Sequence, residues 1–124
     1  MQTNLKKAQI GKTGVEVTRI GMGGAPIGKG DIDIAVESLE TAYREGIRYF
    51  DTAPLYGTGR SETYYGKFLP TISRDDFTLS TKVGRLLLSE DDATKFSYSE
   101  LVNLESDVFK INNRSAKYLS LIHI

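Results

Sequence analysis

The feature that most constrains this chain is the alternation of strand-like and helix-like segments along its N-terminal part. Residues 47–51 and 77–82 are short runs rich in β-branched and aromatic side chains, as strands are, and residues 19–22 form a third strand candidate. Residues 31–45 place apolar side chains at helical spacing between a capping aspartate and a terminating glycine, and residues 61–68 form a shorter helix candidate that starts at a serine cap. Parallel strands need crossovers of this kind, so the order predicts a parallel sheet with right-handed crossovers.

The two ends of the chain differ from this pattern. Near the N-terminus, residues 8–17 form two short strand-like runs around a glycine-bounded turn, which predicts a β-hairpin. After residue 84 the periodicity fades. Residues 89–92 and 112–115 are typical of loops, and only residues 99–109 could carry a helical turn. A stretch of this length without a clear element indicates a long functional loop or missing context.

Composition argues against several kinds of partner. Lys and Arg together number 16, as do Asp and Glu, which leaves no net charge to attract nucleic acid or an anionic membrane. No apolar run approaches the roughly 20 residues of a membrane helix, and residues 1–7 lack the apolar core of a signal peptide. The absence of cysteine excludes disulfides, thiolate metal sites and a cysteine nucleophile. We therefore expect a cytoplasmic protein with no nucleic-acid or membrane partner.

Three residues with acid–base chemistry follow two of the predicted strands. Asp51 ends one strand, Tyr56 lies in the loop after it, and Lys82 ends the next strand. The C-terminal ends of the strands in an α/β barrel lie on one face, where active sites are built, so these side chains are expected to converge. A phenol is a weak acid, a nearby ammonium makes loss of its proton easier, and a carboxylate keeps that ammonium charged and in place. Such a set can protonate a carbonyl oxygen while hydride arrives at the carbon.

Each of these residues has an ordinary alternative. An aspartate after a strand more often caps the next helix or loop, a loop tyrosine usually packs against its neighbours, and a single lysine is nearly always solvated. The functional interpretation therefore depends on the coincidence of all three residues at one face of the sheet.

The glycine-rich run at residues 21–26 is not a Rossmann phosphate loop. The motif G-x-G-x-x-G fails because Pro26 occupies the place of the last glycine. A tight strand exit that lets a ligand approach the backbone fits this run better.

The motifs of this chain resemble those of the aldo-keto reductase family. The string GIRYFDTAPLYG at residues 46–57, followed by Ser61 and Glu62, is similar to the family signature. STKVG at residues 80–84 is similar to its catalytic-lysine strand, and RIGMG at residues 19–23 to its first strand. The resemblance implies the N-terminal portion of a (β/α)8 TIM barrel, with a β-hairpin closing the bottom, and NADP or NAD bound without a Rossmann domain.

The resemblance also implies a role for each site residue. Tyr56 would be the proton donor in reduction and the base in oxidation, Lys82 would make its proton easier to release, and Asp51 would hold Lys82. The fuller wording DTAPLYGTGRSE is similar to the sugar 1-dehydrogenase and pyridoxal dehydrogenase branch, which implies a small-molecule carbonyl or sugar substrate and no metal. The cofactor-binding residues implied near the nicotinamide are Gly23, Gly24, Ala25 and Asp51.

The length of the chain is short for this fold. A (β/α)8 barrel takes roughly 250 residues, whereas this chain has 124. We expect one partial domain over residues 1–124 that belongs to a larger oxidoreductase and neither folds stably nor turns over substrate by itself. Two alternatives stay open: a cofactor-sensing regulatory module of the same fold, and a barrel of other chemistry in which Lys82 forms a Schiff base.

The only histidine, His123, has two interpretations. It resembles the family's fourth catalytic residue, a histidine that ends the fourth strand, but residues 112–118 lack the amphipathic helix that should precede that strand. The codons of a common sequencing adapter can also encode LSLIHI, residues 119–124. The hypothesis that these last residues are not native therefore stands beside a genuine fourth strand.

Overall fold

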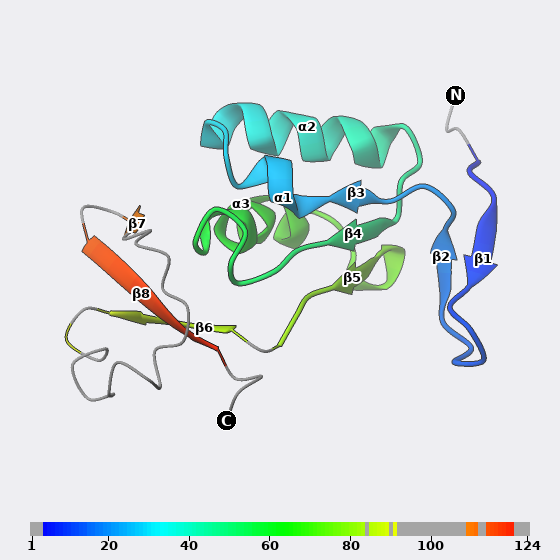
Figure 1. Ribbon diagram of the computed structural model, residues 1–124. Coiled ribbons are helices and arrows are strands. Elements are labelled where there is room, and N and C mark those ends of the chain that lie inside the picture. The colour runs from blue at the N-terminus through cyan, green and yellow to red at the C-terminus, as the bar shows by residue number, and fades with distance from the viewer. Residues whose placement is uncertain (1–3, 84, 90, 92–108, 112–113, 121–124) are drawn as a thin grey trace.

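The centre of the molecule is a small parallel sheet. The computed structural model describes residues 4–83, 85–89, 91, 109–111 and 114–120. Strands β3 (Met22–Gly23), β4 (Tyr49–Asp51) and β5 (Thr78–Ser80) lie side by side in that order, and both pairings are parallel (Figure 1). The predicted parallel arrangement is confirmed.

A hairpin precedes this sheet. Strands β1 (Lys7–Gln9) and β2 (Glu16–Thr18) pair antiparallel, as the turn pattern predicted. The connecting turn contains Gly11 at φ 55° and Gly14 at φ 75°, a backbone conformation that glycine adopts without strain. Figure 1 shows the hairpin in dark blue beside the ends of the parallel strands where β4 and β5 begin.

Two helices provide the crossovers between the parallel strands. Helix α2 (Ile32–Arg44) joins β3 to β4, and its first turn is capped by Asp31, whose carboxylate accepts a hydrogen bond of 2.8 Å from the amide of Asp33. Gly46, at φ 96°, follows its C-terminus. Helix α3 (Arg60–Phe68) lies between β4 and β5. The predicted helix at residues 31–45 is therefore confirmed to within a residue at each end.

Several local expectations are wrong in detail. The first parallel strand is residues 22–23 rather than 19–22, and the tight strand exit expected after it is a short helix, α1 (Gly24–Ile27). Helix α3 is preceded by Gly59 in the left-handed conformation, so Ser61 is not its cap. Two short 3₁₀ turns, η1 (Leu69–Thr71) and η2 (Arg74–Asp76), follow α3.

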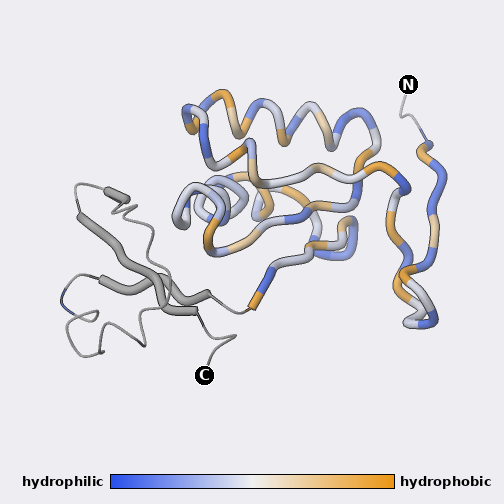
Figure 2. Tube along the Cα trace, in the orientation of Figure 1, coloured by the Kyte–Doolittle hydropathy of each residue, from blue (hydrophilic) through white to orange (hydrophobic). Residues whose placement is uncertain are grey.

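The hydrophobic core lies between the sheet and its helices. Phe50, fully buried on β4, makes edge-to-face contacts with Tyr65, Phe68 and Phe77 at centroid separations of 5.9–6.1 Å. Leu39 of α2 packs into the same cluster. Figure 2 shows apolar and polar residues alternating along α2, as expected of a helix that buries one side. Because neighbouring residues of a strand face opposite ways, burial of Phe50 leaves the residues before and after it on the other face of the sheet.

The C-terminal part forms a second, antiparallel sheet in the order β6–β8–β7. Its strands are β6 (Arg85–Ser89), β7 (Phe109–Ile111) and β8 (Arg114–Ser120). The expectation of loops is wrong for residues 114–115 and for Ser89. Residues 114–115 pair with the adjacent strand β7, and Ser89 pairs with Ala116 of β8, so strand pairing satisfies backbone groups where local periodicity gives no signal. Leu119 and Ser120 likewise belong to an antiparallel strand. The predicted helical turn at 99–109 falls mostly, and His123 entirely, outside the described residues.

Candidate active site

The topology brings the predicted site residues to one edge of the sheet. Asp51 is the last residue of β4, and its register partner on β5 is Ser80. Lys82 lies two residues beyond the end of β5 rather than at its end, which corrects the prediction. The amide of Thr52 donates to the carbonyl of Ser80 at 2.9 Å and continues the pairing past the strand ends. Asp51 and Lys82 therefore leave adjacent strands at the same edge.

Asp51 and Lys82 form an ion pair. The Lys82 Nζ lies 2.9 Å from both Oδ1 and Oδ2 of Asp51, and it donates a third hydrogen bond of 3.2 Å to the carbonyl of Thr52. The two side chains are 48% and 34% exposed, so a ligand can reach them. The hydrogen bond to Asp51 raises the pKa of Lys82 above its usual value, and the lysine stays an ammonium at neutral pH.

Tyr56 lies beside this ammonium. The Lys82 Nζ is 4.8 Å from the centroid of the Tyr56 ring, and the interaction with Tyr56 also raises the pKa of Lys82. The structure thus brings Asp51, Tyr56 and Lys82 together although 31 residues separate the first from the last. A phenol next to an ammonium that a carboxylate holds in place is an arrangement suited to proton transfer.

The loop that carries Tyr56 is held by close backbone packing. Gly57 adopts φ 59°, and a Cβ there would overlap the carbonyl oxygen of Gly28, so only glycine fits this contact. Arg60 Nε donates to the same carbonyl at 2.8 Å. The amide of Ser61 donates to the carbonyl of Tyr56 at 3.1 Å. These contacts fix the backbone of Tyr56 relative to the start of α3.

The predicted cofactor-binding residues occupy the neighbouring strand end. Gly23 is the register partner of Asp51, and a Cβ at Gly23 would meet nothing within 4 Å, so its backbone borders open space. Gly24 is different: a Cβ there would lie 2.5 Å from the Asp51 carbonyl oxygen and 2.6 Å from Ser61 Oγ. Packing alone therefore requires glycine at position 24. Ala25 is half-buried in α1.

Sequence reasoning missed the contacts of four hydroxyl residues in this region. Ser80 Oγ donates to Asp51 Oδ1 at 2.7 Å, and the Tyr49 hydroxyl lies 3.2 Å from Ser80 Oγ. Thr52 Oγ1 and Ser61 Oγ form a buried hydrogen bond of 2.8 Å beneath the loop. The sequence did contain a signal that Tyr49 lies near Asp51, because the two residues are two positions apart on one strand and therefore share a face of the sheet.

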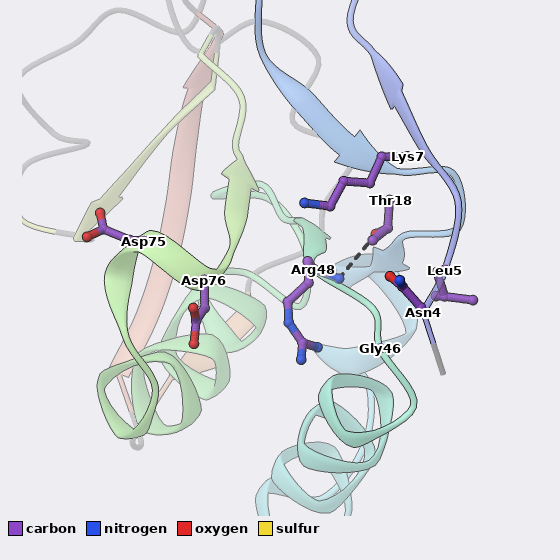
Figure 3. Close-up of a pocket in the computed structure, with 8 residues that line it drawn as sticks. All are labelled: Asn4, Leu5, Lys7, Thr18, Gly46, Arg48, Asp75 and Asp76. Atoms are coloured by element: carbon purple, nitrogen blue, oxygen red, sulfur yellow. Dashed lines mark hydrogen bonds between the residues drawn. The ribbon is translucent and has the colours of Figure 1, made fainter. Parts of the chain in front are cut away.

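A polar pocket lies at the opposite ends of the strands. Figure 3 shows the Arg48 side chain between Asp76 on one side and the hairpin residues Lys7 and Thr18 on the other. Arg48 stacks at 3.8 Å on the ring of Tyr43 and donates to that residue's carbonyl, so its charge is already partnered. Because this pocket lies where β4 and β5 begin, it is separate from the cluster around Asp51. In α/β barrels this end contributes to stability rather than to catalysis.

Within the described residues, no cluster of three or more histidine, aspartate or glutamate side chains could hold a metal ion. In the same part of the chain, no helix combines the length and apolar character needed to cross a membrane.

Comparison with known proteins identifies relatives of similar sequence. The chain is 41% identical over 92 residues to pyridoxal 4-dehydrogenase of Microbacterium luteolum and 48% identical over 79 residues to D-threo-aldose 1-dehydrogenase of a Pseudomonas species. These matches cover 68% and 60% of the chain but only 26% and 24% of the relatives. The chain thus spans about a quarter of the length of these relatives.

Solved structures agree with this relationship. An aldo-keto reductase of Bacillus halodurans in its holo form matches with a TM-score of 0.61 at 36% identity, over 66% of this chain and 27% of that one. The glycerol dehydrogenase of Gluconobacter oxydans matches with a TM-score of 0.56 at 28% identity, over 82% and 33%. The predicted fold class, an incomplete (β/α)8 barrel, is confirmed. The profile of the Aldo/keto reductase family matches residues 19–122, and the chain therefore belongs to this family.

Proposed function

We propose that the protein containing this segment is an NAD(P)-dependent oxidoreductase that interconverts a carbonyl and an alcohol, with Tyr56 as proton donor and acceptor. The observation that carries the proposal is the contact of Tyr56 with the Lys82 ammonium, which Asp51 holds through both carboxylate oxygens. Family membership supports it, because the relatives named above are dehydrogenases of small molecules.

The chain's own residues supply the proton chemistry. In reduction, the Tyr56 hydroxyl donates its proton to the carbonyl oxygen, and the adjacent Lys82 ammonium stabilises the phenolate that forms. In oxidation the same phenolate accepts the proton of the substrate hydroxyl. In reduction and in oxidation alike, Asp51 keeps the Lys82 ammonium charged and directed toward the Tyr56 ring. A nicotinamide cofactor, when bound, supplies the hydride to the carbonyl carbon or accepts it from the alcohol carbon.

The residues at the adjacent strand end fit a nicotinamide ring. Gly23 borders open space on the side where a Cβ would stand, and it lies directly across from Asp51 in the sheet. A depression lined by Met22, Gly23, Tyr49 and Asp51, and also by the hairpin residues Ala8, Val17 and Thr18, is mostly apolar, which suits a flat heterocycle. We propose that Gly23, Ala25 and Asp51 contact the nicotinamide. Gly24 contributes by letting α1 pack tightly behind this surface.

For the substrate, we propose an aldose in its ring form or a pyridoxal-like compound. The support is the similarity to an aldose 1-dehydrogenase, a pyridoxal 4-dehydrogenase and, at 38% identity, L-galactose dehydrogenase of Arabidopsis thaliana. We propose either NAD or NADP as the cofactor.

The test is nicotinamide-dependent turnover by the complete protein that contains this segment. Purified protein is assayed with D-threo-aldoses and pyridoxal, and with NAD and NADP in turn, by absorbance of the reduced cofactor. We expect turnover in the wild type, a loss of at least about 100-fold in Tyr56→Phe, and a similar loss in Lys82→Met.

The matched control is Tyr64→Phe, because the Tyr64 hydroxyl donates only to the carbonyl of Gly30 at 3.3 Å, away from Asp51. Unchanged kcat in Tyr56→Phe would overturn the assignment of the proton donor. Tight cofactor binding without turnover would favour a regulatory module, and a borohydride-trapped adduct on Lys82 would favour Schiff-base chemistry. The isolated segment is expected to show no turnover.

A further inference from the structure

Two hydroxyl groups beside Asp51 belong to a connected set of hydrogen bonds. Ser80 Oγ lies 2.7 Å from Asp51 Oδ1, and the Tyr49 hydroxyl lies 3.2 Å from Ser80 Oγ. The Lys82 Nζ reaches the same Asp51 Oδ1 at 2.9 Å. Tyr49, Ser80, Asp51 and Lys82 therefore form one continuous chain of contacts, which we call the hydroxyl chain.

The direction of each hydrogen bond follows from the available protons. An aspartate paired with an ammonium is ionised, so Asp51 only accepts, and it accepts from both Ser80 and Lys82. Ser80 has a single hydroxyl proton, and that proton goes to Asp51. The Tyr49 hydroxyl must therefore donate to Ser80 Oγ. Hydrogen bonds arranged head to tail in this way strengthen one another.

The backbone fixes the members of the hydroxyl chain. Asp51 and Ser80 are register partners of β4 and β5, and Tyr49 lies two residues before Asp51 on the same strand face. The ring of Tyr49 packs against Gly21, where an added Cβ would lie 2.9 Å from Tyr49 Cδ1. Glycine at position 21 thus leaves the space that the Tyr49 ring occupies, and the ring can place its hydroxyl against Ser80.

We propose that Ser80 is a positioning residue for the reaction at Tyr56, and that Tyr49 acts by orienting Ser80. The inference rests on the proposed function. Asp51 holds Lys82 through two oxygens, and Ser80 is the neutral side chain that fixes one of them. With Ser80 removed, the carboxylate can turn about its side-chain bonds, and the ammonium no longer faces the Tyr56 ring in one orientation. Substrate binding does not depend on this contact, so kcat rather than KM should change.

The kinetic test uses the complete protein with substitutions that delete or retain one hydroxyl. We expect Ser80→Ala to lower kcat about 10-fold with KM within about twofold, as befits loss of a hydrogen bond to a charged group. Ser80→Thr, which keeps the hydroxyl, should restore kcat to within about twofold of wild type. Tyr49→Phe should lower kcat about threefold and have no further effect in the Ser80→Ala background. Ser38→Ala is the matched control, because its hydroxyl donates to the carbonyl of Ile34 in an exposed hydrogen bond within α2.

Three kinetic outcomes would overturn the inference. Ser80→Ala with kcat within twofold of wild type would show that Asp51 needs no support from Ser80. Effects of Tyr49→Phe and Ser80→Ala that multiply, or a raised KM for Tyr49→Phe in both backgrounds, would show that Tyr49 contacts the ligand instead of acting through Ser80.

A spectroscopic readout separates this inference from the proposed function. The ammonium group of Lys82 is observed by ¹H–¹⁵N NMR and assigned by its loss in Lys82→Met. Its signal should shift and broaden in Ser80→Ala and return in Ser80→Thr, whether or not the protein turns over a substrate. An unchanged signal in Ser80→Ala would refute the hydroxyl chain, whereas an inactive wild type with the expected spectra would refute only the proposed function.

Discussion

Replacement of Asp51 by asparagine should separate the stability of the fold from its chemistry. Asp51 holds Lys82 Nζ at 2.9 Å through both oxygens, whereas an asparagine keeps one oxygen and turns an amide N–H toward the ammonium. Lys82 retains its 3.2 Å hydrogen bond to the Thr52 carbonyl. Because both partners of the ion pair are partly exposed, its loss should lower the free energy of unfolding by only about 0–1 kcal/mol.

The effect of this substitution on turnover should be much larger. The hydrogen bond to Asp51 is the largest cause of the raised pKa of Lys82, so the pKa of Lys82 should fall in Asp51→Asn and any alkaline loss of activity should move to lower pH. Because proton transfer through Tyr56 depends on a charged and oriented ammonium, we expect kcat to fall by about 100-fold or more.

The assay combines urea unfolding with the pH dependence of kcat in the complete protein. Asp75→Asn is the matched control, because this exposed carboxylate lies before β5 at the opposite end of the strand. If kcat of Asp51→Asn is within about threefold of wild type, the hypothesis that the Asp51–Lys82 ion pair takes part in catalysis is refuted. A loss of more than about 3 kcal/mol in stability would indicate that Asp51 serves mainly to hold the fold together.

Four further outcomes follow from the packing and the ion pair. Ser61→Ala should lower the free energy of unfolding, measured by urea denaturation, by about 1–3 kcal/mol, because it leaves the buried hydroxyl of Thr52 without its partner. Phe50→Ala should lower the free energy of unfolding by about 3–5 kcal/mol in the same assay, since a fully buried ring is removed. Gly57→Ala should cost at least about 1 kcal/mol and also lower kcat, because a Cβ there displaces the loop that carries the proposed proton donor. The stability difference between wild type and Lys82→Met should be constant from neutral pH to about 10.5 and shrink above it; a change already complete by pH 9 would contradict the raised pKa of Lys82.

Local signals explain what the sequence allowed one to predict. The helix after Asp31 was predictable because its cap, its apolar spacing and Gly46 all lie within or beside the segment itself. The meeting of Asp51 and Lys82 was predictable because parallel strands end at a common edge, and the ion pair lies there.

Partners distant in sequence explain the errors. Ser61 has the residue type of a helix cap, but its hydroxyl bonds to Thr52 and the turn before α3 is made by Gly59 instead. The strand at residues 114–120 pairs with residues 85–89, and nothing in either segment alone indicates the other. The contact of Ser80 with Asp51 was missed because Ser80 was considered only as part of a motif, not as the register partner of a carboxylate.

Tyr56 and Lys82 should act as one unit in the reaction. The most direct measurement is kcat/KM of the complete protein for Tyr56→Phe, Lys82→Met and the double variant. If the ammonium acts only by stabilising the Tyr56 phenolate, the double variant should be no slower than Tyr56→Phe alone, because groups that act as a unit are not additive. Losses that multiply in the double variant would contradict this account and assign the two side chains independent roles.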